Sequence, residues 1–167
     1  MPTDGLELIR AANIHSQMND PDVAHLVIGL NEVTSSRTVP GLGVDVQSMD
    51  DGVGIEVSVA EGARIPKPVH MCFGLLEEQG VQKINLRFAA EARSKIDIVA
   101  HCVFPNAADV RHLMDAELEI GDEAEYSYFE RHIHSAEGGI LVVPKSRVRI
   151  GSGARFRTDF ELIEGRV

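Results

Sequence analysis

A short motif recurs along the chain at intervals close to thirty residues. It places an alanine between a glycine or glutamate and a charged residue, as in Gly62-Ala63-Arg64, Glu91-Ala92-Arg93, Glu123-Ala124-Glu125 and Gly153-Ala154-Arg155, with alanines 29, 32 and 30 residues apart. A fixed period of this length is typical of a repeat architecture, in which the chain returns to the same corner one layer further on. The recurrence therefore predicts a β-solenoid, with a β-sandwich or β-barrel as the alternative for a strand-rich chain.

Strict alternation of apolar and polar residues supports a mainly β fold after Gly43. Such alternation is typical of strands with one buried face, and glycine or charged turns separate the segments. We expect strands at Val44–Val46, Ile55–Val59, Ile96–Ile98, Leu118–Ile120, Val148–Ile150 and Phe156–Phe160.

The N-terminal residues show a different period. Leu6, Ile9 and Ile14 recur near helical spacing, and Thr3 or Asp4 can cap that helix. We expect a second helix to begin at Asp20-Pro21 and to present Val23, Leu26, Val27 and Leu30 on one face. We therefore divide the chain into an acidic helical segment and loop, residues 1–42, and a solenoid core, residues 43–167, which we expect to be truncated at its C-terminal end.

Charge and composition exclude several classes of partner. The net charge is −10, and residues 1–62 contain two basic and ten acidic side chains, a balance of −8. This charge argues against nucleic acid or an anionic membrane as a partner. No long apolar run and no signal-peptide pattern is present, so we expect cytoplasmic residence and reduced thiols.

Both cysteines fall at similar distances from the repeated alanines. Cys72 lies nine residues after Ala63, Cys102 ten after Ala92, and His134 ten after Ala124. In a solenoid, Cys72, Cys102 and His134 would form a column with about 4.8 Å between layers. Such a column can hold a metal or pass sulfur along, although buried cysteines also stack as small hydrophobes.

The histidines permit a second interpretation. The run His132-Ile-His134-Ser-Ala-Glu137 places two imidazoles on one side of a strand near a carboxylate, which suits a cupin-like metal-binding β-barrel enzyme. The spacing typical of structural zinc sites, the Walker phosphate loop and the nucleophile elbow are all absent from the sequence. A purely structural solenoid that forms a homodimer through its exposed edge is a third interpretation.

The segment from Asn85 onward resembles a known family in the order of its motifs. These are Ile84–Phe88, His101–Pro105, His112–Glu117, Gly121–Tyr128, and the closing Pro144-Lys, Gly153–Phe156 and Glu164–Val167. They are similar to the SufB/SufD family, the scaffold subunits of the SUF iron–sulfur cluster assembly system. The resemblance implies a right-handed parallel β-helix and a non-enzymatic assembly role.

The same resemblance implies partners and site residues. It implies a SufC-type ABC ATPase, a related SufB/SufD subunit and a transient iron–sulfur cluster. Cys102-Val-Phe-Pro105 matches a family pattern for receiving persulfide sulfur, with Phe104 in place of a small residue, and His112 matches a family histidine. We expect His101 to lower the pKa of the Cys102 thiol. The chain ends without the later coils and helical region of the family, so we expect a fragment.

Overall fold

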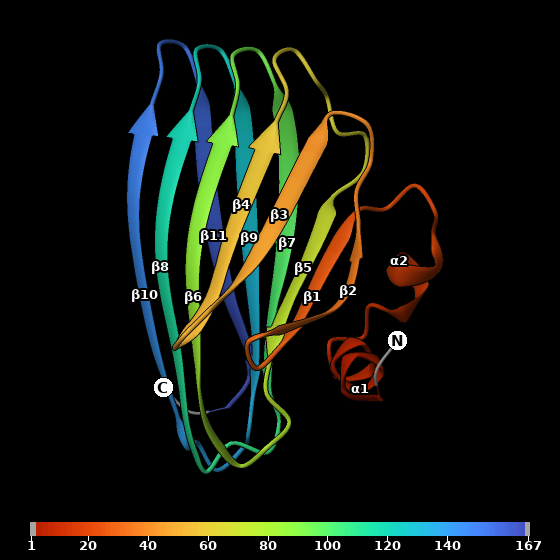
Figure 1. Cartoon of the computed structure of the whole chain (residues 1–167), viewed down its shortest axis with the longest axis vertical. Helices are drawn as coiled ribbons and strands as arrows, with labels where there is room; N and C mark the ends of the chain where they lie inside the picture. The colour runs from red at the N-terminus through yellow and green to blue at the C-terminus, as the bar shows by residue number, and fades with distance from the viewer. Residues whose placement is uncertain (1–2, 166–167) are drawn as a thin grey trace.

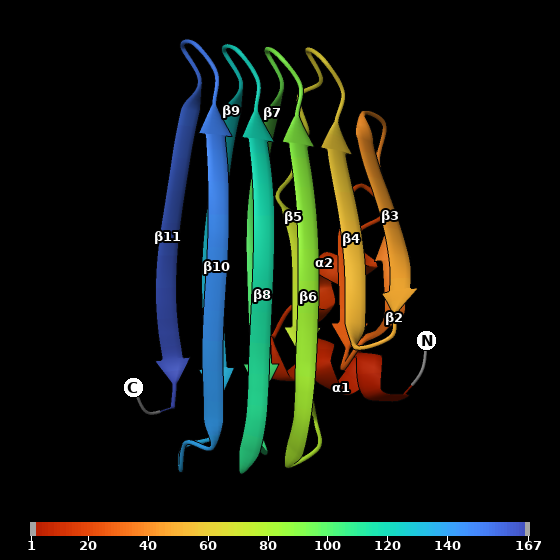
Figure 2. The same ribbon diagram turned by 60° about the vertical axis from the view of Figure 1, so that its left-hand side comes forward.

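The chain winds into a parallel β-solenoid whose two walls are β-sheets, as a computed structural model shows for residues 3–165 (Figure 1). One sheet has the strand order β11-β9-β7-β5-β1-β2 and the other β10-β8-β6-β4-β3. Successive coils turn in a right-handed sense (Figures 1 and 2). The predicted fold, a right-handed parallel β-helix with a short N-terminal helical segment, is confirmed.

Strands alternate between the two walls along the sequence. The first wall contains β1 (His25–Gly29), β2 (Glu32–Arg37), β5 (Val69–Gly74), β7 (Lys95–Phe104), β9 (Glu125–His134) and β11 (Arg155–Glu164). The second contains β3 (Leu42–Met49), β4 (Gly52–Val59), β6 (Gln79–Ala90), β8 (Asp109–Ile120) and β10 (Ile140–Ile150). Every predicted strand lies within one of these elements.

The repeated corner is real, but its register differs from the expected one. Backbone amides pair Lys95 with Ala63, Glu125 with Ser94, and Arg155 with Ala124. The small residues of the corner are therefore Ala63, Ser94, Ala124 and Ala154, with Ser94 in place of the expected Ala92. The sequence motif misplaced one corner by two residues because serine there replaces alanine.

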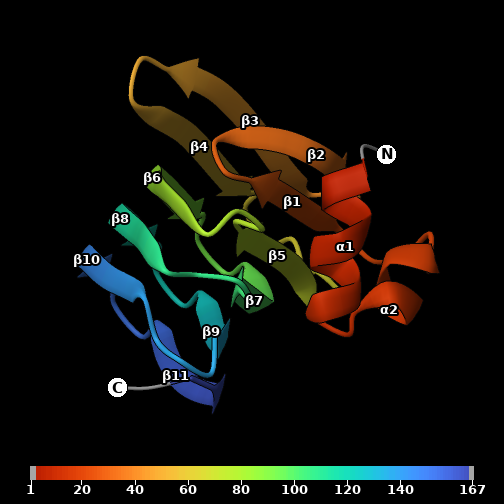
Figure 3. The ribbon, with the colours of Figure 1, turned by 90° about the horizontal axis from the view of Figure 1, so that it is seen from below.

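Two short helices, α1 (Thr3–Ala11) and α2 (His15–Asn19), lie against the outer face of the first wall (Figure 3). Leu8 and Ile9 of α1 pack on Val27, Cys72 and Val103 of the wall. Leu6 was predicted to lie on the apolar face of this helix, but its side chain is exposed. The predicted caps of this helix are Thr3 and Asp4, and their side chains are not among those that the structure describes.

The predicted second helix is wrong. Residues 20–22 form a turn and His25–Gly29 form β1, which pairs in parallel with β5. Residues 23–28 are all buried because the core covers one face of the strand and the helical segment covers the other. An apolar run of this kind carries no period of 2 and is easily read as helix.

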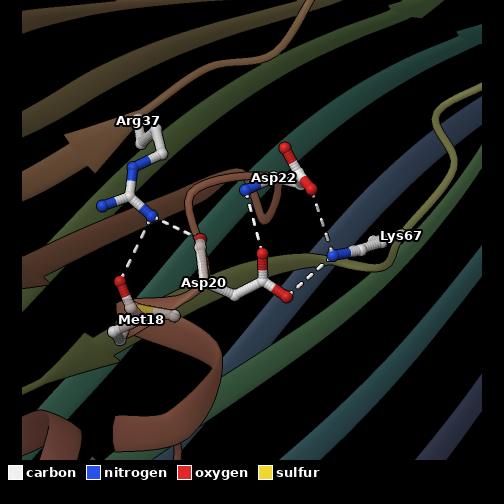
Figure 4. Close-up of polar contacts among 5 residues, drawn as sticks. All are labelled: Met18, Asp20, Asp22, Arg37 and Lys67. Atoms are coloured by element: carbon white, nitrogen blue, oxygen red, sulfur yellow. Dashed lines mark hydrogen bonds and ion pairs between the residues drawn. The ribbon is translucent and has the colours of Figure 1, made fainter.

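A polar clasp fixes the turn after α2 to the solenoid (Figure 4). The Arg37 guanidinium donates to the backbone carbonyls of Met18 and Asp20. The Lys67 ammonium lies 2.7 Å from a carboxylate oxygen of Asp20 and 3.5 Å from one of Asp22. The clasp joins the helical segment to β2 and to the loop before β5.

Candidate functional site

A group of polar side chains lies inside the solenoid, near the end of the walls where β7, β9 and β5 finish. Parallel pairing aligns Phe73, Cys102 and His132 in one row of the first wall. On the facing wall, Gln82 pairs with His112. Cys102, Gln82, His112 and His132 are buried, with at most 1% of each residue exposed. The two walls thus bring a thiol, an amide and two imidazoles into one interior space.

Glu130 completes this group from the strand that carries His132. The Cys102 Sγ lies 3.5 Å from Glu130 Oε1, to which the thiol donates, and 3.9 Å from His112 Nε2. His132 Nε2 is 3.0 Å from the same Glu130 oxygen. The ligand atoms of Cys102, Glu130 and His132 all lie within 4.8 Å of one another. We call Cys102, His112, Glu130 and His132 the interior site.

The amide of Gln82 determines which nitrogen of His112 faces the thiol. Its NH₂ group donates to the backbone carbonyls of Leu30 and Gly74, so its carbonyl oxygen points to His112. That oxygen accepts a 2.9 Å hydrogen bond from His112 Nδ1. A neutral imidazole carries one proton, so the lone pair of His112 is on Nε2 and is directed at Cys102.

A second imidazole extends the hydrogen-bonded chain away from the thiol. His132 Nδ1 lies 2.9 Å from His134 Nε2, and both rings point into the interior. Because ionised Glu130 can only accept, His132 donates to it from Nε2. The thiol, the carboxylate and the two imidazoles thus form a continuous path for a proton.

Burial and hydrogen bonds set the protonation states of the interior site. Burial, together with the neighbouring Glu130 charge, raises the pKa of the Cys102 thiol well above its usual value. Burial alone would raise the pKa of Glu130, but the hydrogen bond and charge of His132 and the bond from Cys102 leave it below its usual value. Burial lowers the pKa of His112 to about 4. The resting state therefore has a protonated thiol, an ionised carboxylate and a neutral His112.

A cavity of about 280 Å³ lies beside the site. It lies between β8, β10, β9 and β11, and Glu130 forms part of its wall together with Tyr128, Ser146 and Phe160. The Glu130 side chain keeps 18% of its surface exposed, whereas Cys102 is fully buried. Glu130 thus separates the thiol from the cavity.

The predicted column of Cys72, Cys102 and His134 is wrong. Cys102 pairs with Phe73 and His132, while Cys72 pairs with His101. Neighbouring residues of a strand face opposite sides of the sheet, so Cys72 points outward beneath α1 and Cys102 points inward. The misplaced corner at Ala92 and the extra residues of the loop before β5 shifted the expected register.

His101 does not lower the pKa of Cys102, contrary to expectation. It lies on the outer face, where its Nε2 is 3.1 Å from His70 Nδ1 and the two rings stack. His112 is the imidazole that the structure places against the thiol. Burial raises the pKa of Cys72 to about 12, so that thiol is protonated under its helix.

The cupin-like β-barrel is also wrong. The walls are open sheets of mainly parallel strands, and Glu137 lies exposed in the turn after β9. His132 and His134 do share one face, as predicted, but their carboxylate neighbour is Glu130. Sequence reasoning missed Glu130 and Gln82. The signal for Glu130 was its period-2 spacing with His132 and His134, which places all three side chains on one face.

Comparison with known proteins gives relatives along nearly the whole chain. No family model matches it. It is 29% identical over 167 residues to a SufBD family iron–sulfur cluster assembly protein of Methanocaldococcus jannaschii, covering 97% of this chain and 52% of that protein. It is 24% identical over 161 residues to a SufBD family protein of Pyrococcus horikoshii, covering 96% of this chain and 49% of that protein.

The chain spans about half the length of the curated relatives it matches. None of the described helices is long and apolar enough to cross a membrane. The parallel β-solenoid is the fold that the resemblance implied, and the similarity extends over the N-terminal segment as well as the coils. The chain is therefore similar to SufBD family proteins over nearly its whole length, and the predicted resemblance to the SufB/SufD family is confirmed.

Proposed function

We propose that this protein is a non-enzymatic scaffold in iron–sulfur cluster assembly, and that Cys102 is the residue that accepts sulfur. The names of its two relatives support the assembly role. The observation that carries the proposal is the position of Cys102, a free thiol inside the solenoid in contact with Glu130 and His112. A thiol with no role other than filling the core has no need of a buried carboxylate beside it.

The interior site offers two proton acceptors, Glu130 and His112, to a thiol that is protonated at rest, so the thiol loses its proton only as sulfur is transferred. A thiolate is the nucleophile in such transfers, and Glu130 is in position to accept the thiol proton. The Cys102 thiolate attacks the outer sulfur of a donor persulfide and forms a new S–S bond. The S–S bond of the donor breaks, and the donor leaves as a thiolate. One sulfur atom moves, the proton resides on Glu130, and no external oxidant or reductant is consumed.

The cavity between β8, β10, β9 and β11 gives the sulfur a space next to Cys102. Glu130 lies in its wall and in contact with the thiol. The fully buried thiol is protected from oxidation, which follows access and thiolate character.

The proposed role includes partners and a transient product. We place the chain with a SufC-type ABC ATPase and a related SufB/SufD subunit, in the cytoplasm, where both thiols remain reduced. An iron–sulfur cluster is then cargo that the complex builds and releases. These partners follow from the likeness to the family.

Sulfur transfer to the two cysteines tests the proposal. The protein is incubated anaerobically, in the presence of a chelator, with a persulfide-loaded cysteine desulfurase, and its peptides are then analysed by mass spectrometry. We expect one added sulfur atom on the Cys102 peptide in the wild type and in Cys72→Ser, and none in Cys102→Ser. Equal labelling of Cys102→Ser and wild type would exclude Cys102 as the acceptor, and the absence of any labelling would favour a purely structural solenoid.

A further inference from the structure

We propose that the interior site binds one divalent transition-metal ion, with Cys102, His112, Glu130 and His132 as its ligands. This inference deepens the proposed function, and it depends on that function only for the identity of the ion as the ferrous iron of cluster assembly. Among the residues that the structure describes, Cys102, Glu130 and His132 are the only three metal-ligating side chains whose ligand atoms converge in this way. His112 adds a fourth donor from the facing wall.

Three of the distances between donor atoms approach those around a tetrahedral ion. Metal–sulfur bonds of about 2.3 Å and metal–nitrogen or metal–oxygen bonds of about 2.0–2.1 Å place sulfur about 3.6 Å from each lighter ligand, and the lighter ligands about 3.4 Å apart. The Cys102 Sγ lies 3.5 Å from Glu130 Oε1 and 3.9 Å from His112 Nε2. The Glu130 oxygen lies 3.0 Å from His132 Nε2. Cys102, Glu130 and His132 already converge within 4.8 Å, whereas His112 lies close to the thiol alone and has to move by more than an ångström to become the fourth ligand.

The imidazole ligands are oriented by partners that lie behind them. Metal-binding histidines commonly donate their second ring N–H to a carbonyl or carboxylate, which fixes the tautomer. Gln82 plays this role for His112, and its own amide is held by the carbonyls of Leu30 and Gly74. On the other side, His134 lies 2.9 Å from His132 Nδ1. When His132 binds the ion through Nε2, it carries its proton on Nδ1 and donates it to His134 Nε2, and His134 then carries its own proton on Nδ1.

The donor set selects the class of ion. A thiolate, two imidazoles and one carboxylate suit zinc, ferrous iron or cobalt, whereas magnesium and calcium prefer oxygen ligands alone. Binding displaces the thiol proton and the hydrogen bond between His132 and Glu130. Glu130 is the ligand that also lies in the wall of the cavity. An ion held here lies in direct contact with the sulfur atom proposed to arrive on Cys102.

Cobalt provides a spectroscopic probe of the site. The metal-free protein is titrated anaerobically with Co²⁺ and no sulfur donor. We expect visible bands of four-coordinate cobalt and a near-ultraviolet thiolate-to-cobalt band, saturating at one equivalent in the wild type and in the matched control Cys72→Ser. Cys102→Ser is expected to lose the thiolate band, and Gln82→Met to weaken binding about 10–100-fold.

Several results would overturn the proposal. Absence of cobalt bands in the wild type, or a thiolate band that persists in Cys102→Ser, would do so. So would a thiolate band that disappears in folded Cys72→Ser. If Cys102→Ser does not fold, X-ray absorption of the zinc-loaded wild type decides: one sulfur among the ligands supports the site, and nitrogen and oxygen alone exclude it. Because sulfur transfer is measured with a chelator and cobalt binding without sulfur, either proposal can fail while the other stands.

Discussion

The residues of the interior site depend on one another through hydrogen bonds that cross the solenoid. Gln82 lies on β6, His112 on β8 and Cys102 on β7, yet a single chain of contacts joins them. Parallel coils make this possible, because residues about thirty apart come to lie side by side and opposite strands face each other across the interior. The chemistry of Cys102 on one wall is therefore set in part by side chains of β6 and β8 on the facing wall.

The amide of Gln82 provides a direct test at this scale. In Gln82→Met, His112 Nδ1–H and two backbone carbonyls lose their partner, so we expect the free energy of unfolding to fall by about 1–3 kcal/mol. We also expect the Nδ1–H tautomer of His112, dominant in the metal-free wild type, to lose its preference. Denaturant titration and nitrogen chemical shifts of the His112 ring measure the two effects.

Gln79→Met is the matched control, because Gln79 lies on the same strand and is exposed. It should leave both the stability and the tautomer unchanged. An unaltered His112 ring in Gln82→Met would show that the amide does not set the tautomer.

The sequence identified some of these residues and missed others for physical reasons. Cys102 and His112 were selected through the family resemblance, and the structure places them in contact. Gln82 was missed because its sequence context does not distinguish a buried polar residue of a strand from an exposed one, and the period-2 spacing of Glu130 with His132 and His134 does not show which face of the strand is buried. The strand register that would have aligned these residues was shifted by two residues, because the sequence motif placed one corner at Ala92 and the structure places it at Ser94.

At the scale of elements, the corner of each coil requires a left-handed backbone at one position. Gly62 and Gly153 adopt φ of 67° there, whereas Arg93 and Glu123 adopt 59° and 58° in the equivalent corners. A side chain in this conformation is strained by about 1–2 kcal/mol, and glycine is not.

Exchanging these residues tests the equivalence of the corners. Glu123→Gly should raise the free energy of unfolding by up to about 1 kcal/mol, because relief of strain outweighs the added freedom of the unfolded chain. The reverse change, Gly153→Ala, should lower it by about 1 kcal/mol. Urea unfolding measures both, and a stabilising Gly153→Ala would contradict the corner assignment.

The contact between α1 and the first wall depends on a glycine. A Cβ on Gly74 would meet the side chain of Leu8 and lie 2.7 Å from the Val103 carbonyl oxygen. We therefore expect Gly74→Ala to destabilise the protein by about 1–3 kcal/mol through overpacking.

Gly54→Ala serves as the control for this change. Its added Cβ would find its nearest neighbour, the Met49 sulfur, at 3.5 Å, an ordinary contact. Thermal unfolding should separate the two variants clearly. Equal stability of Gly74→Ala and Gly54→Ala would mean that α1 does not pack on β5 as described.

Strands that the sequence revealed differ systematically from those it did not. β3, β4 and β8 have one polar face and alternate plainly, so their period was visible. β5 is buried throughout, and β9 places Glu130 and two histidines inside, so neither has the apolar alternation of a strand with one buried face. The polar residues of the interior site therefore obscured the apolar alternation of β9, which carries two of its four residues.

For the whole molecule, buried imidazoles make stability depend on pH. Burial lowers the pKa of His101, His112 and His134 to about 4 in the folded state. In the unfolded chain these groups titrate near 6.5. Between these values the unfolded state binds more protons, so stability falls as pH decreases from about 6.5 to about 4 and becomes insensitive to these groups below that.

We expect the free energy of unfolding to decrease across this window, by up to about 3 kcal/mol for fully buried His112 alone. His101→Phe should make the decrease shallower, while the exposed His15→Gln should leave it unchanged. Urea titrations between pH 4 and pH 7 measure the slope. A slope that His101→Phe does not alter would show that this imidazole titrates normally in the folded protein.

The architecture as a whole was accessible from the sequence because a solenoid repeats its signal. The near thirty-residue recurrence and the alternating strands predicted coils, and the structure confirms them. β1 was mistaken for a helix because it is buried on both faces, which removes the period that distinguishes a strand. The sequence was thus informative about coils and less so about where the helical segment meets them.

The most direct test of the account is a crystal structure of the protein after anaerobic loading with persulfide sulfur, with sulfur atoms located by anomalous scattering. The account predicts one additional sulfur bonded to the Cys102 Sγ, inside the solenoid and beside His112 and Glu130, with Cys72 unmodified beneath α1. Additional sulfur on Cys72, or an unmodified Cys102 in protein whose mass shows an added sulfur atom, would contradict it.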